Sequence, residues 1–489
     1  MAGAKKRSPK KSPKKSPKKR AVSSAASKKV PKQLRVRMYR VGFGDFFLVT
    51  VPSADGPRHI VIDCGVTRGK TGKGDIATIK TAVRHMAKET GSKLSLIIVT
   101  HRHQDHIIGF SRCPEFSKFK VDAVWMPYWE TEYAPKVTAF QADLENVALS
   151  LRAAALAGNH DEHTDEVLAI VENATGMSLT EGPGGGTNKK SLELLKKGLG
   201  VKPDYYAKGD RAKLPSALIK AGLKATILGP PPADEVDFLK LMDLQKGVGQ
   251  YVAAATAGRG RTALMPFDSD FVVDASSYPA TAFREFAPRS PGRAPDAETR
   301  HDRALEQAVK RATPAALFMA AKKLDAMLNN QSLVVLFEWK GKKLLFAGDA
   351  QGGNWEYWLF GAGVPAKDPS ALKLSNEGKS ILGSIDFYKV GHHGSTNATP
   401  IPAVEAMRND FAAMCSVEAH TFGTESNNSE VPRGPLLDAL EKKGALVRSD
   451  QIAVSVGELD VPAGSKVSLP MPKKGRFVIG SCYVDYLLS

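Results

Sequence analysis

A histidine-rich motif at the end of an apolar run constrains the fold of this chain more than any other feature. Residues 100–106 read Thr-His-Arg-His-Gln-Asp-His and directly follow Leu-Ile-Ile-Val. In an extended segment His101 and His103 lie on one face, so both imidazoles can reach the same cation. Asp105 and His106 come just past the predicted strand, where the chain can turn back toward a second cation. Imidazole and carboxylate suit zinc and its first-row neighbours, so the motif predicts a metal site.

Chance clustering of histidines in a polar loop is the alternative explanation of this motif. The chain has 11 His among 489 residues. At that frequency the whole pattern is expected by accident in about one of 10^4 chains of this length. We therefore interpret the motif as metal-binding, and two later segments support this interpretation.

Both later segments repeat the design of an apolar strand that ends in possible metal ligands. Asp349 follows Leu-Leu-Phe-Ala-Gly, and His392 and His393 follow a predicted strand at 385–390. In an α/β protein such strand ends converge on a common edge of the sheet. We expect these residues to meet the histidine motif there.

The order of predicted elements indicates an α/β fold. Strands are predicted at 35–41, 46–51, 59–62, 94–99, 121–126, 223–228, 332–339, 344–347, 385–390, 412–417, near 446, and at 452–456 and 476–487, and helices at 75–90, 139–157, 165–173, 301–328, from 400, and at 435–443. Strand pairs and crossover helices occur in both halves, which favours two β-sheets packed face to face with helices outside. Residues 34–489 are predicted to form one domain, with mainly helical insertions at about 129–200 and 235–328.

The net charge of +18 belongs mostly to the N-terminal segment. Residues 1–33 hold 13 Lys or Arg and no Asp or Glu. The remaining 56 of the 69 basic residues face 51 acidic residues, so the predicted domain is only mildly basic. The strong positive charge therefore describes a tail.

This tail contains three copies of the tetrapeptide Ser-Pro-Lys-Lys. Its repeat lysines are Lys10, Lys11, Lys14, Lys15, Lys18 and Lys19. Ser-Pro favours turns and the lysines repel one another, so we expect a disordered tail with no packed structure. It resembles the tails of histone-H1-like proteins, and a flexible polycation binds nucleic acid by releasing counterions from phosphates. A solubilising tail, or one that binds any anionic surface, is the alternative.

Cysteine use and hydropathy indicate a cytoplasmic protein, with association to a nucleoid or nucleus possible through the tail. The four cysteines are scattered and form no Cys-x-x-Cys pair, as in a reducing compartment. No run of 18 apolar residues is present, and no apolar segment follows the basic N-terminus. We therefore expect neither a membrane partner nor a secretory signal.

Six segments together carry a family resemblance. They are residues 41–45 (Val-Gly-Phe-Gly-Asp), 62–65 (Ile-Asp-Cys-Gly), 100–106, 330–334 (Asn-Gln-Ser-Leu-Val), 346–349 (Phe-Ala-Gly-Asp) and 389–395 (Lys-Val-Gly-His-His-Gly-Ser). In these the chain resembles the metallo-β-lactamase fold superfamily, and most closely the hydrolase domains of bacterial DNA-uptake (competence) channel proteins and their free-standing relatives. The similarity covers about 35–128, 200–232 and 328–457, and it implies an αββα sandwich.

The resemblance implies a site for two divalent cations. His101 and His103 would hold one ion, and Asp105 and His106 would hold the other. Asp349 would bridge the two ions. Zinc is the expected metal, with manganese as the alternative.

Further residues of the implied site act around the ions. His393 is the preferred remaining ligand because it directly precedes a glycine, as in related nucleases of the fold. His392 would then contact the substrate or orient the attacking water, and the reverse assignment stays open. Lys389 would stabilise charge on a phosphoryl group if it faces the cleft, and a core-edge position is the alternative. Asp45 and Asp63 are expected to brace the site through hydrogen bonds.

The chain departs from the family pattern at the first cation. Most members with two metals supply a third His between the motif and the bridging Asp. That interval here offers His160, His163 and His301, all outside the matched segments. The competence-type branch has an Asn/Ser segment instead, which Asn330 and Ser332 match. We expect these two residues to shape the site and the first cation site to be incomplete.

The implied activity is hydrolysis by a hydroxide that bridges two metals and that Asp105 helps to orient. Such a nucleophile attacks phosphodiesters, β-lactams and thioesters alike, so the ligands do not name the substrate. The competence-type resemblance and the polycationic tail favour a phosphodiesterase or nuclease, with nucleic acid as partner.

Two other functions stay open from the sequence. One is hydrolysis of a small ester, a phosphocholine group or a lactam by the same fold. The other is a non-catalytic nucleic-acid-binding protein with a degenerate metal site. The insertion at 129–200 also offers a docking surface for a protein partner, and the sequence carries no signal for the oligomeric state.

Overall fold

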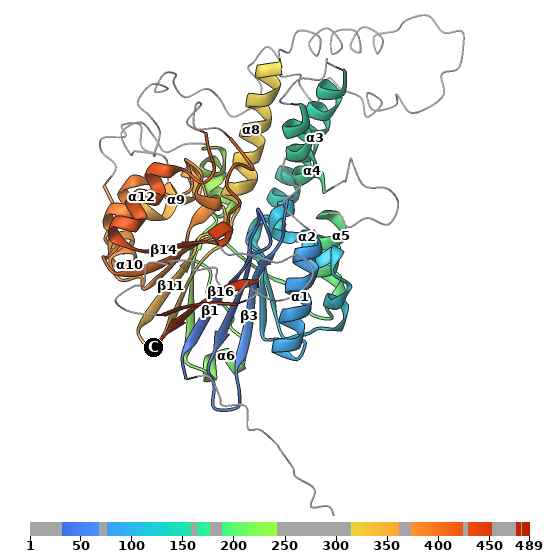
Figure 1. The fold of residues 1–489 in the computed structure, drawn as a ribbon. Helices are drawn as coiled ribbons and strands as arrows, with labels where there is room; N and C mark the ends of the chain where they lie inside the picture. Colours follow the sequence, from blue (N-terminus) through green and yellow to red (C-terminus); the bar gives the residue numbers. More distant parts are fainter. Residues whose placement is uncertain are drawn as a thin grey trace, which may run out of the picture.

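The computed structural model is a mixed α/β structure built on two large β-sheets (Figure 1). It describes residues 32–67, 76–157, 164–176, 188–241, 314–360, 373–423, 429–451, 476–480 and 482–489. The predicted α/β class is thereby confirmed. The basic tail with its repeat lysines, the histidines His160, His163 and His301, and the predicted strand at 452–456 lie outside the described residues.

The first sheet has eight strands and contains both antiparallel and parallel pairs. In spatial order these are β15 (Arg476–Ile479), β16 (Tyr483–Leu488), β1 (Leu34–Tyr39), β2 (Phe46–Val51), β3 (Arg58–Cys64), β5 (Leu96–Ile98), β7 (Val124–Pro127) and β8 (Asp204–Tyr206). Their β-branched and aromatic residues suit a pleated surface that is buried on both faces. Because β3, β5 and β7 run parallel, the carboxyl ends of β3 and β5 lie at the same edge.

The second sheet has six strands. In spatial order they are β14 (Gly444–Arg448), β13 (Phe411–Cys415), β12 (Phe387–Lys389), β11 (Lys342–Phe346), β10 (Val334–Trp339) and β9 (Leu223–Gly229). The predicted hairpin is confirmed, because β10 and β11 pair antiparallel. From β11 to β14 all pairs are parallel, so the ends of β11, β12 and β13 also meet at one edge.

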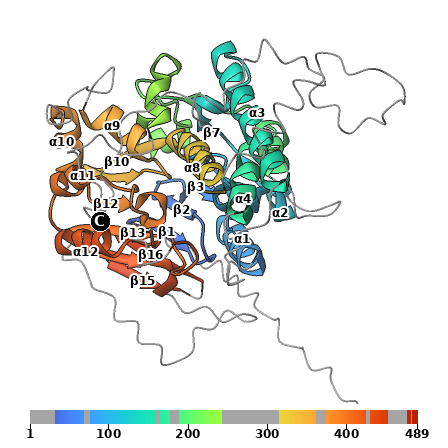
Figure 2. The same cartoon turned by 90° about the horizontal axis from the view of Figure 1, so that it is seen from above.

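One hydrophobic core fills the space between the two sheets. Phe47 of the first sheet and Phe346 of the second have ring centroids 6.1 Å apart, and Phe387 stacks on Tyr486 at 5.7 Å. Helices cover the outer faces (Figures 1 and 2). Those on the first sheet are α1 (Ile76–Thr90) and α2 (Gln104–Arg112), and those on the second are α9 (Gly352–Phe360), α10 (Asn376–Leu382), α11 (Ile401–Ala406) and α12 (Gly434–Lys443).

Three helices from the two predicted insertions form a separate bundle, which we call the helical cap. They are α3 (Pro135–Ala157), α4 (Thr164–Thr175) and α8 (Pro314–Asn330). Leu151, Ile170 and Leu324 contribute to its own small core. Figure 1 shows the cap rising above one edge of the sheets. The cap therefore joins two segments that lie far apart in the sequence.

The predicted continuous strand at 94–99 is divided in the structure. Leu94 belongs to the short strand β4 (Lys93–Leu94), which pairs with β6 (Lys120–Val121), and β5 begins at Leu96. Leu94 packs under α1, whereas Leu96 faces the core between the sheets. A continuous strand would point both side chains to the same face, so the break at Ser95 is what lets them reach opposite cores. The predicted strand at 121–126 is divided in the same way, into β6 and β7.

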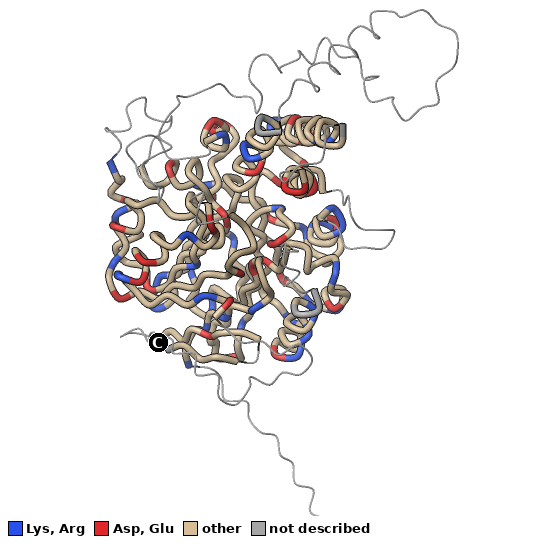
Figure 3. The backbone as a smooth tube through the Cα atoms, turned by 45° about the horizontal axis from the view of Figure 1, so that its top comes forward, with Lys and Arg blue, Asp and Glu red and all other residues tan. Residues whose placement is uncertain are grey.

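Charged residues of both signs are interspersed over the described part of the chain (Figure 3). This pattern agrees with the mildly basic composition of the predicted domain outside the tail. Among the described helices, none combines the length and the apolar character that a membrane crossing requires.

Candidate metal centre

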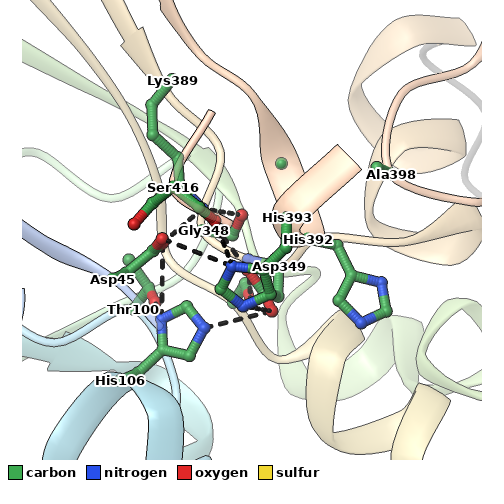
Figure 4. Close-up of polar contacts among 12 residues, drawn as sticks. Asp45, Thr100, His106, Gly348, Asp349, Lys389, His392, His393, Ala398 and Ser416 are labelled. Carbon is green, nitrogen blue, oxygen red and sulfur yellow. Dashed lines mark hydrogen bonds and ion pairs between the residues drawn. The ribbon is translucent and has the colours of Figure 1, made fainter. Parts of the chain in front are cut away.

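Strand ends from both sheets meet at one edge of the molecule, beneath the helical cap. From the first sheet, β5 leads into the histidine motif. From the second sheet, β11 leads into Asp349 and β12 leads into His393. Figure 4 shows His106, Asp349 and His393 pointing toward one another from these different segments.

Four of the predicted ligands form a compact cluster. The ligand atoms of Asp105, His106, Asp349 and His393 all lie within 4.8 Å of one another. His393 Nε2 lies 2.9 Å from Asp105 Oδ2 and 3.4 Å from Asp349 Oδ2. His106 Nε2 lies 3.1 Å from the same Asp349 oxygen. Two imidazoles and two carboxylates that converge in this way could hold a metal ion, and the donor set suits zinc and its neighbours.

The two imidazoles of the cluster are held in place from behind. Asp63 Oδ2 lies 2.8 Å from His106 Nδ1 and also accepts a hydrogen bond from the Thr100 hydroxyl at 2.6 Å. His393 Nδ1 donates to the backbone carbonyl of Ser416 at 2.7 Å. Each ring therefore turns its Nε2 toward the centre of the cluster. An acceptor on the far nitrogen is the usual support of a metal-binding histidine.

The ionisation of the cluster follows these pairings. Burial by itself lowers the pKa of both imidazoles, but the carboxylates, Asp349 foremost, raise that of His106 well above its usual value and that of His393 to about 10. Burial also opposes ionisation of the acids, yet the imidazoles hold the pKa of Asp349 far below its usual range and lower that of Asp105 to about 2. Two imidazolium protons thus balance two carboxylates. A divalent cation carries the same charge and fits in their place.

Lys389, for which a catalytic role is predicted, lies buried against the cluster, at the core-edge position that the sequence left as the alternative. Its ammonium pairs with Asp45, donates to the Gly348 carbonyl at 3.0 Å and lies 3.4 Å from Asp349 Oδ1. These three acceptors match the three ammonium protons, and the side chain is 2% exposed. No proton is left for a substrate. Asp45 also lies 3.7 Å from Nδ1 of both His106 and His393, so it contacts the cluster directly as well as through Lys389.

His101 and His103 lie beside the cluster and outside it. Their ring centroids are 4.5 Å apart, and the His101 ring lies 4.1 Å from that of His106. Both side chains are buried, and within the described residues neither Nε2 has a hydrogen-bond partner. Burial lowers the pKa of both, so each is a neutral imidazole that is able to bind a cation. Asp325 of α8 brings Oδ1 to 3.7 Å from His103 Nε2.

The adjacent histidines His392 and His393 point in different directions (Figure 4). Both have left-handed backbone conformations, with φ of 42° and 51°. Such values are uncommon outside glycine and concentrate at functional sites. The turn directs His393 into the cluster, as preferred from the sequence. His392 stays outside it, with Nδ1 2.8 Å from the Ser395 hydroxyl and 3.1 Å from Asn397 Oδ1.

Asn330 and Ser332 act as supports for the site. The Asn330 amide donates to two backbone carbonyls at 3.1 and 2.7 Å, and its oxygen accepts from the backbone of Asn354 at 3.0 Å. Ser332 Oγ accepts from the backbone N–H of Asp349 at 3.1 Å. These contacts hold the segment against Asp349 and Asn354, and the shaping role expected of Asn330 and Ser332 stays a prediction.

Gly65, which ends the Ile-Asp-Cys-Gly segment, allows the motif to approach β3. A Cβ atom at this position would lie 2.1 Å from the Asp105 carbonyl carbon and 2.2 Å from the His106 backbone nitrogen. Only glycine fits so close a backbone contact. Gly65 therefore helps to fix the position of the backbone at Asp105 and His106, from which their side chains extend.

Three residues of the site were not predicted from the sequence: Thr100, Asp325 and Ser416. Thr100 and Ser416 each end or follow a predicted strand, a signal that applies to many residues. Asp325 and Asn329 are four residues apart on α8, so they lie on one helical face that ends at Asn330. That spacing is a usable signal only when the helix is known to reach the site.

No protein-family model matches the chain, and a search among curated proteins finds no match either. The assignment of a function therefore depends on the site itself.

Proposed function

We propose that this protein is a metal-dependent hydrolase of the metallo-β-lactamase fold, with phosphodiesters as its substrate class. The observation that carries the proposal is the buried cluster of Asp105, His106, Asp349 and His393, braced by outer acceptors. Helices outside two packed mixed sheets support an αββα sandwich of that fold.

Divalent cations at such a site supply a nucleophile from water near neutral pH and take up charge on the attacked group. The four residues of the cluster would hold one cation. His101 and His103 lie next to the cluster, each with an Nε2 that no described residue hydrogen-bonds, and they would contribute to a second. Asp349 would belong to both sites, as the family resemblance implies, and in the structure its carboxylate contacts His106 and His393 of the cluster.

Asp105, His392 and Lys389 are proposed to orient the attacking water, transfer a proton and hold Asp349, respectively. Asp105 is the most exposed member of the cluster, at 14%, so its carboxylate is the one that an attacking water reaches first. His392 is partly buried, and burial lowers its pKa, so the ring is neutral near pH 7. Ser395 fixes its Nδ1, and the opposite nitrogen is then directed to accept or donate a proton. Lys389 holds Asp349 in position.

The choice of phosphodiesters over other substrates has two supports. The first is the similarity of six short segments to competence-type hydrolases. The second is the lysine repeat of the tail, which attracts a polyanion such as DNA or RNA. The insertion at 129–200 contributes α3 and α4 to the helical cap and remains the surface proposed for a protein partner.

The test is metal content together with nuclease activity, on the full chain after chelation and refilling with zinc or manganese. We expect about two cations per chain, and loss of cleavage in an Asp105→Ala, His106→Ala double variant. A matched control is Asp438→Ala, Glu441→Ala on the exposed face of α12, which should keep both properties. Bound metal without cleavage of DNA or RNA would move the substrate to a small ester, a phosphocholine compound or a lactam. Absence of metal would leave a nucleic-acid-binding protein with a degenerate site.

Deletion of residues 1–33 tests the role of the tail separately. The deletion removes 13 positive charges, so nucleic-acid affinity should fall and should depend less on salt. Turnover of a small diester, which the tail cannot hold, should stay unchanged. Equal loss on both substrates would refute the proposed division between tail and site.

A further inference from the structure

We propose that Asn173 and Asn188 of the 129–200 insertion are positioning residues of the metal centre, which hold the backbone on both sides of His103. This inference rests on the proposed function, because it concerns how the same histidine motif is held in place. Both asparagines lie outside the segments that carry the family resemblance. The insertion thereby becomes part of the site.

Two residues of the motif segment 101–106, Arg102 and Gln104, are not candidate ligands, and both bind the insertion. The backbone N–H of Gln104 donates to Asn173 Oδ1 at 2.9 Å. The backbone carbonyl of Arg102 accepts from Asn188 Nδ2 at 3.1 Å. The two peptide groups that flank His103 are therefore both held by side chains of the insertion.

The bond to Gln104 also caps α2, the helix that carries Asp105 and His106. Gln104 is the first residue of α2, and within the described residues the N-cap His103 makes no side-chain hydrogen bond to the helix. The first N–H groups of a helix have no partner inside it, and a Ser, Thr, Asp or Asn at the N-cap usually supplies one. Here Asn173 of α4 supplies an acceptor that His103 does not.

The two asparagines also hold each other. Asn188 Nδ2 donates to Asn173 Oδ1 at 3.2 Å, and Asn188 is only 6% exposed. Asn188 begins α5 (Asn188–Glu193), whose Ser191 hydroxyl donates to that of Ser111 on α2 at 2.9 Å, and Figure 1 shows α5 beside α2. A buried amide that lost these bonds would be left without partners, so the pair favours one position of the motif.

The Arg102 side chain adds a second link to the same end of α4. Its Nη1 donates to the Ala174 carbonyl at 3.1 Å, and its Nε donates to Glu130 Oε1 at 2.6 Å. Glu130 is 3% exposed, and Lys196 Nζ lies 3.4 Å from its other oxygen. Since these bonds join the motif to the insertion, a shift of α4 would also displace Arg102 and Gln104.

The experiment uses the full chain and measures hydrogen exchange in α2, zinc affinity and turnover of bis(4-nitrophenyl) phosphate. Asn173→Leu removes the acceptor, so exchange in the first turn of α2 should be about fivefold faster in the metal-free chain. Zinc should bind about 10-fold more weakly, and with saturating zinc kcat should fall about 10-fold at unchanged KM. Asn173→Asp keeps an acceptor at a helix N-terminus and should restore all these values. Asn146→Leu, at an exposed position of α3, is the matched control and should change none of them.

Gln104→Pro tests the same bond from the side of the motif. Proline has no N–H and is favoured at the first position of a helix, and His103 already has the extended backbone that precedes proline, with φ of −63° and ψ of 150°. This variant should reproduce the weaker zinc binding, and Asn173→Leu should then add nothing to it. Additive losses of zinc affinity in the double variant would overturn the role of this bond.

The outcomes separate this inference from the proposed function. Equal exchange in the wild type and Asn173→Leu would overturn the capping of α2. Faster exchange with unchanged zinc affinity and kcat would overturn the positioning role, because Asn173 would then only stabilise the fold. Zinc binding by the wild type without hydrolysis of the diester would count against the proposed function alone, since exchange and zinc affinity still test Asn173. A wild type that binds no zinc would overturn both.

Discussion

His106 lies five residues after His101 in the chain, and the two imidazoles face opposite electrostatic surroundings. His106 contacts Asp63 and Asp349, and its pKa is raised. The His101 ring lies beside it, tilted by 54°, and its Nε2 has no hydrogen-bond partner among the described residues. Burial lowers its pKa. His393, like His106, lies beside carboxylates that raise its pKa. His103, like His101, has a pKa that burial lowers.

This contrast teaches that residue type and spacing define only the candidates for a metal site. We call the cluster of Asp105, His106, Asp349 and His393 the acidic half, and His101 with His103 the neutral half. The acidic half forms because the second sheet brings Asp349 and His393 to the first. The neutral half, His101 and His103, belongs to no group of converging ligands among the described residues. The two halves should therefore respond differently to loss of charge, to pH and to removal of outer support.

The largest effect is expected from Asp349→Asn, which removes the carboxylate shared by the imidazoles and Lys389. Cation binding at the acidic half should be lost, and hydrolysis should fall at least about 10^3-fold. Metal analysis and steady-state rates check this, with Asp438→Asn on α12 as a control. A variant that keeps most of its rate would show that the acidic half is not the reactive centre.

Charge removal should destabilise the acidic half more than the neutral half. Lys389→Met leaves Asp45 and Asp349 without their buried partner, and we expect the free energy of unfolding to fall by about 3–5 kcal/mol. His101→Gln, in the neutral half, should lower it by about 1–2 kcal/mol. Urea unfolding of the metal-free proteins measures both. Equal losses would contradict the contrast, and adding Asp45→Asn to Lys389→Met should recover part of the loss.

Another buried histidine, His59, sharpens the comparison through the pH dependence of protein stability. Burial is the main cause that lowers its pKa from 6.5 to about 4. Between these values the unfolded chain binds the proton and the folded protein does not, so stability is present above pH 6.5 and is lost as the pH falls toward 4. This residue should account for up to about 3 kcal/mol of that loss.

The measurement is urea unfolding of the wild type and of His59→Gln across this pH range. The variant should show the smaller loss of stability on acidification. If the free energy of unfolding fell equally with decreasing pH in both proteins, His59 would not be held neutral by the fold.

The smallest effect is expected from Asp63→Asn, which acts on a ligand from behind. An asparagine can still contact His106 Nδ1, but it cannot supply the negative charge. Cation affinity should fall about 10- to 100-fold while the fold is retained. Calorimetric titration with zinc measures the change. A loss as complete as in Asp349→Asn would mean that Asp63 is itself a ligand.

Much of the fold could be predicted because the apolar runs are long and regular. The strand Phe46–Val51 is found as expected, and the hairpin around Gly341 follows from two β-prone runs and a turn. The break at Ser95 could not be predicted, since it depends on which of two cores each leucine reaches. The same applies to Lys389, whose alternation along a strand does not tell whether its ammonium meets a substrate or Asp45.

By itself, the sequence determined the types of the candidate ligands, their order in the chain and their place after buried strands, because apolar periodicity and motif spacing are local properties. Only the tertiary structure decided which histidines lie beside carboxylates, which of His392 and His393 faces the cluster, and that Asp325 lies near His103. These depend on distances between residues that are remote in sequence, and the electrostatic environment of a buried group is set by such neighbours.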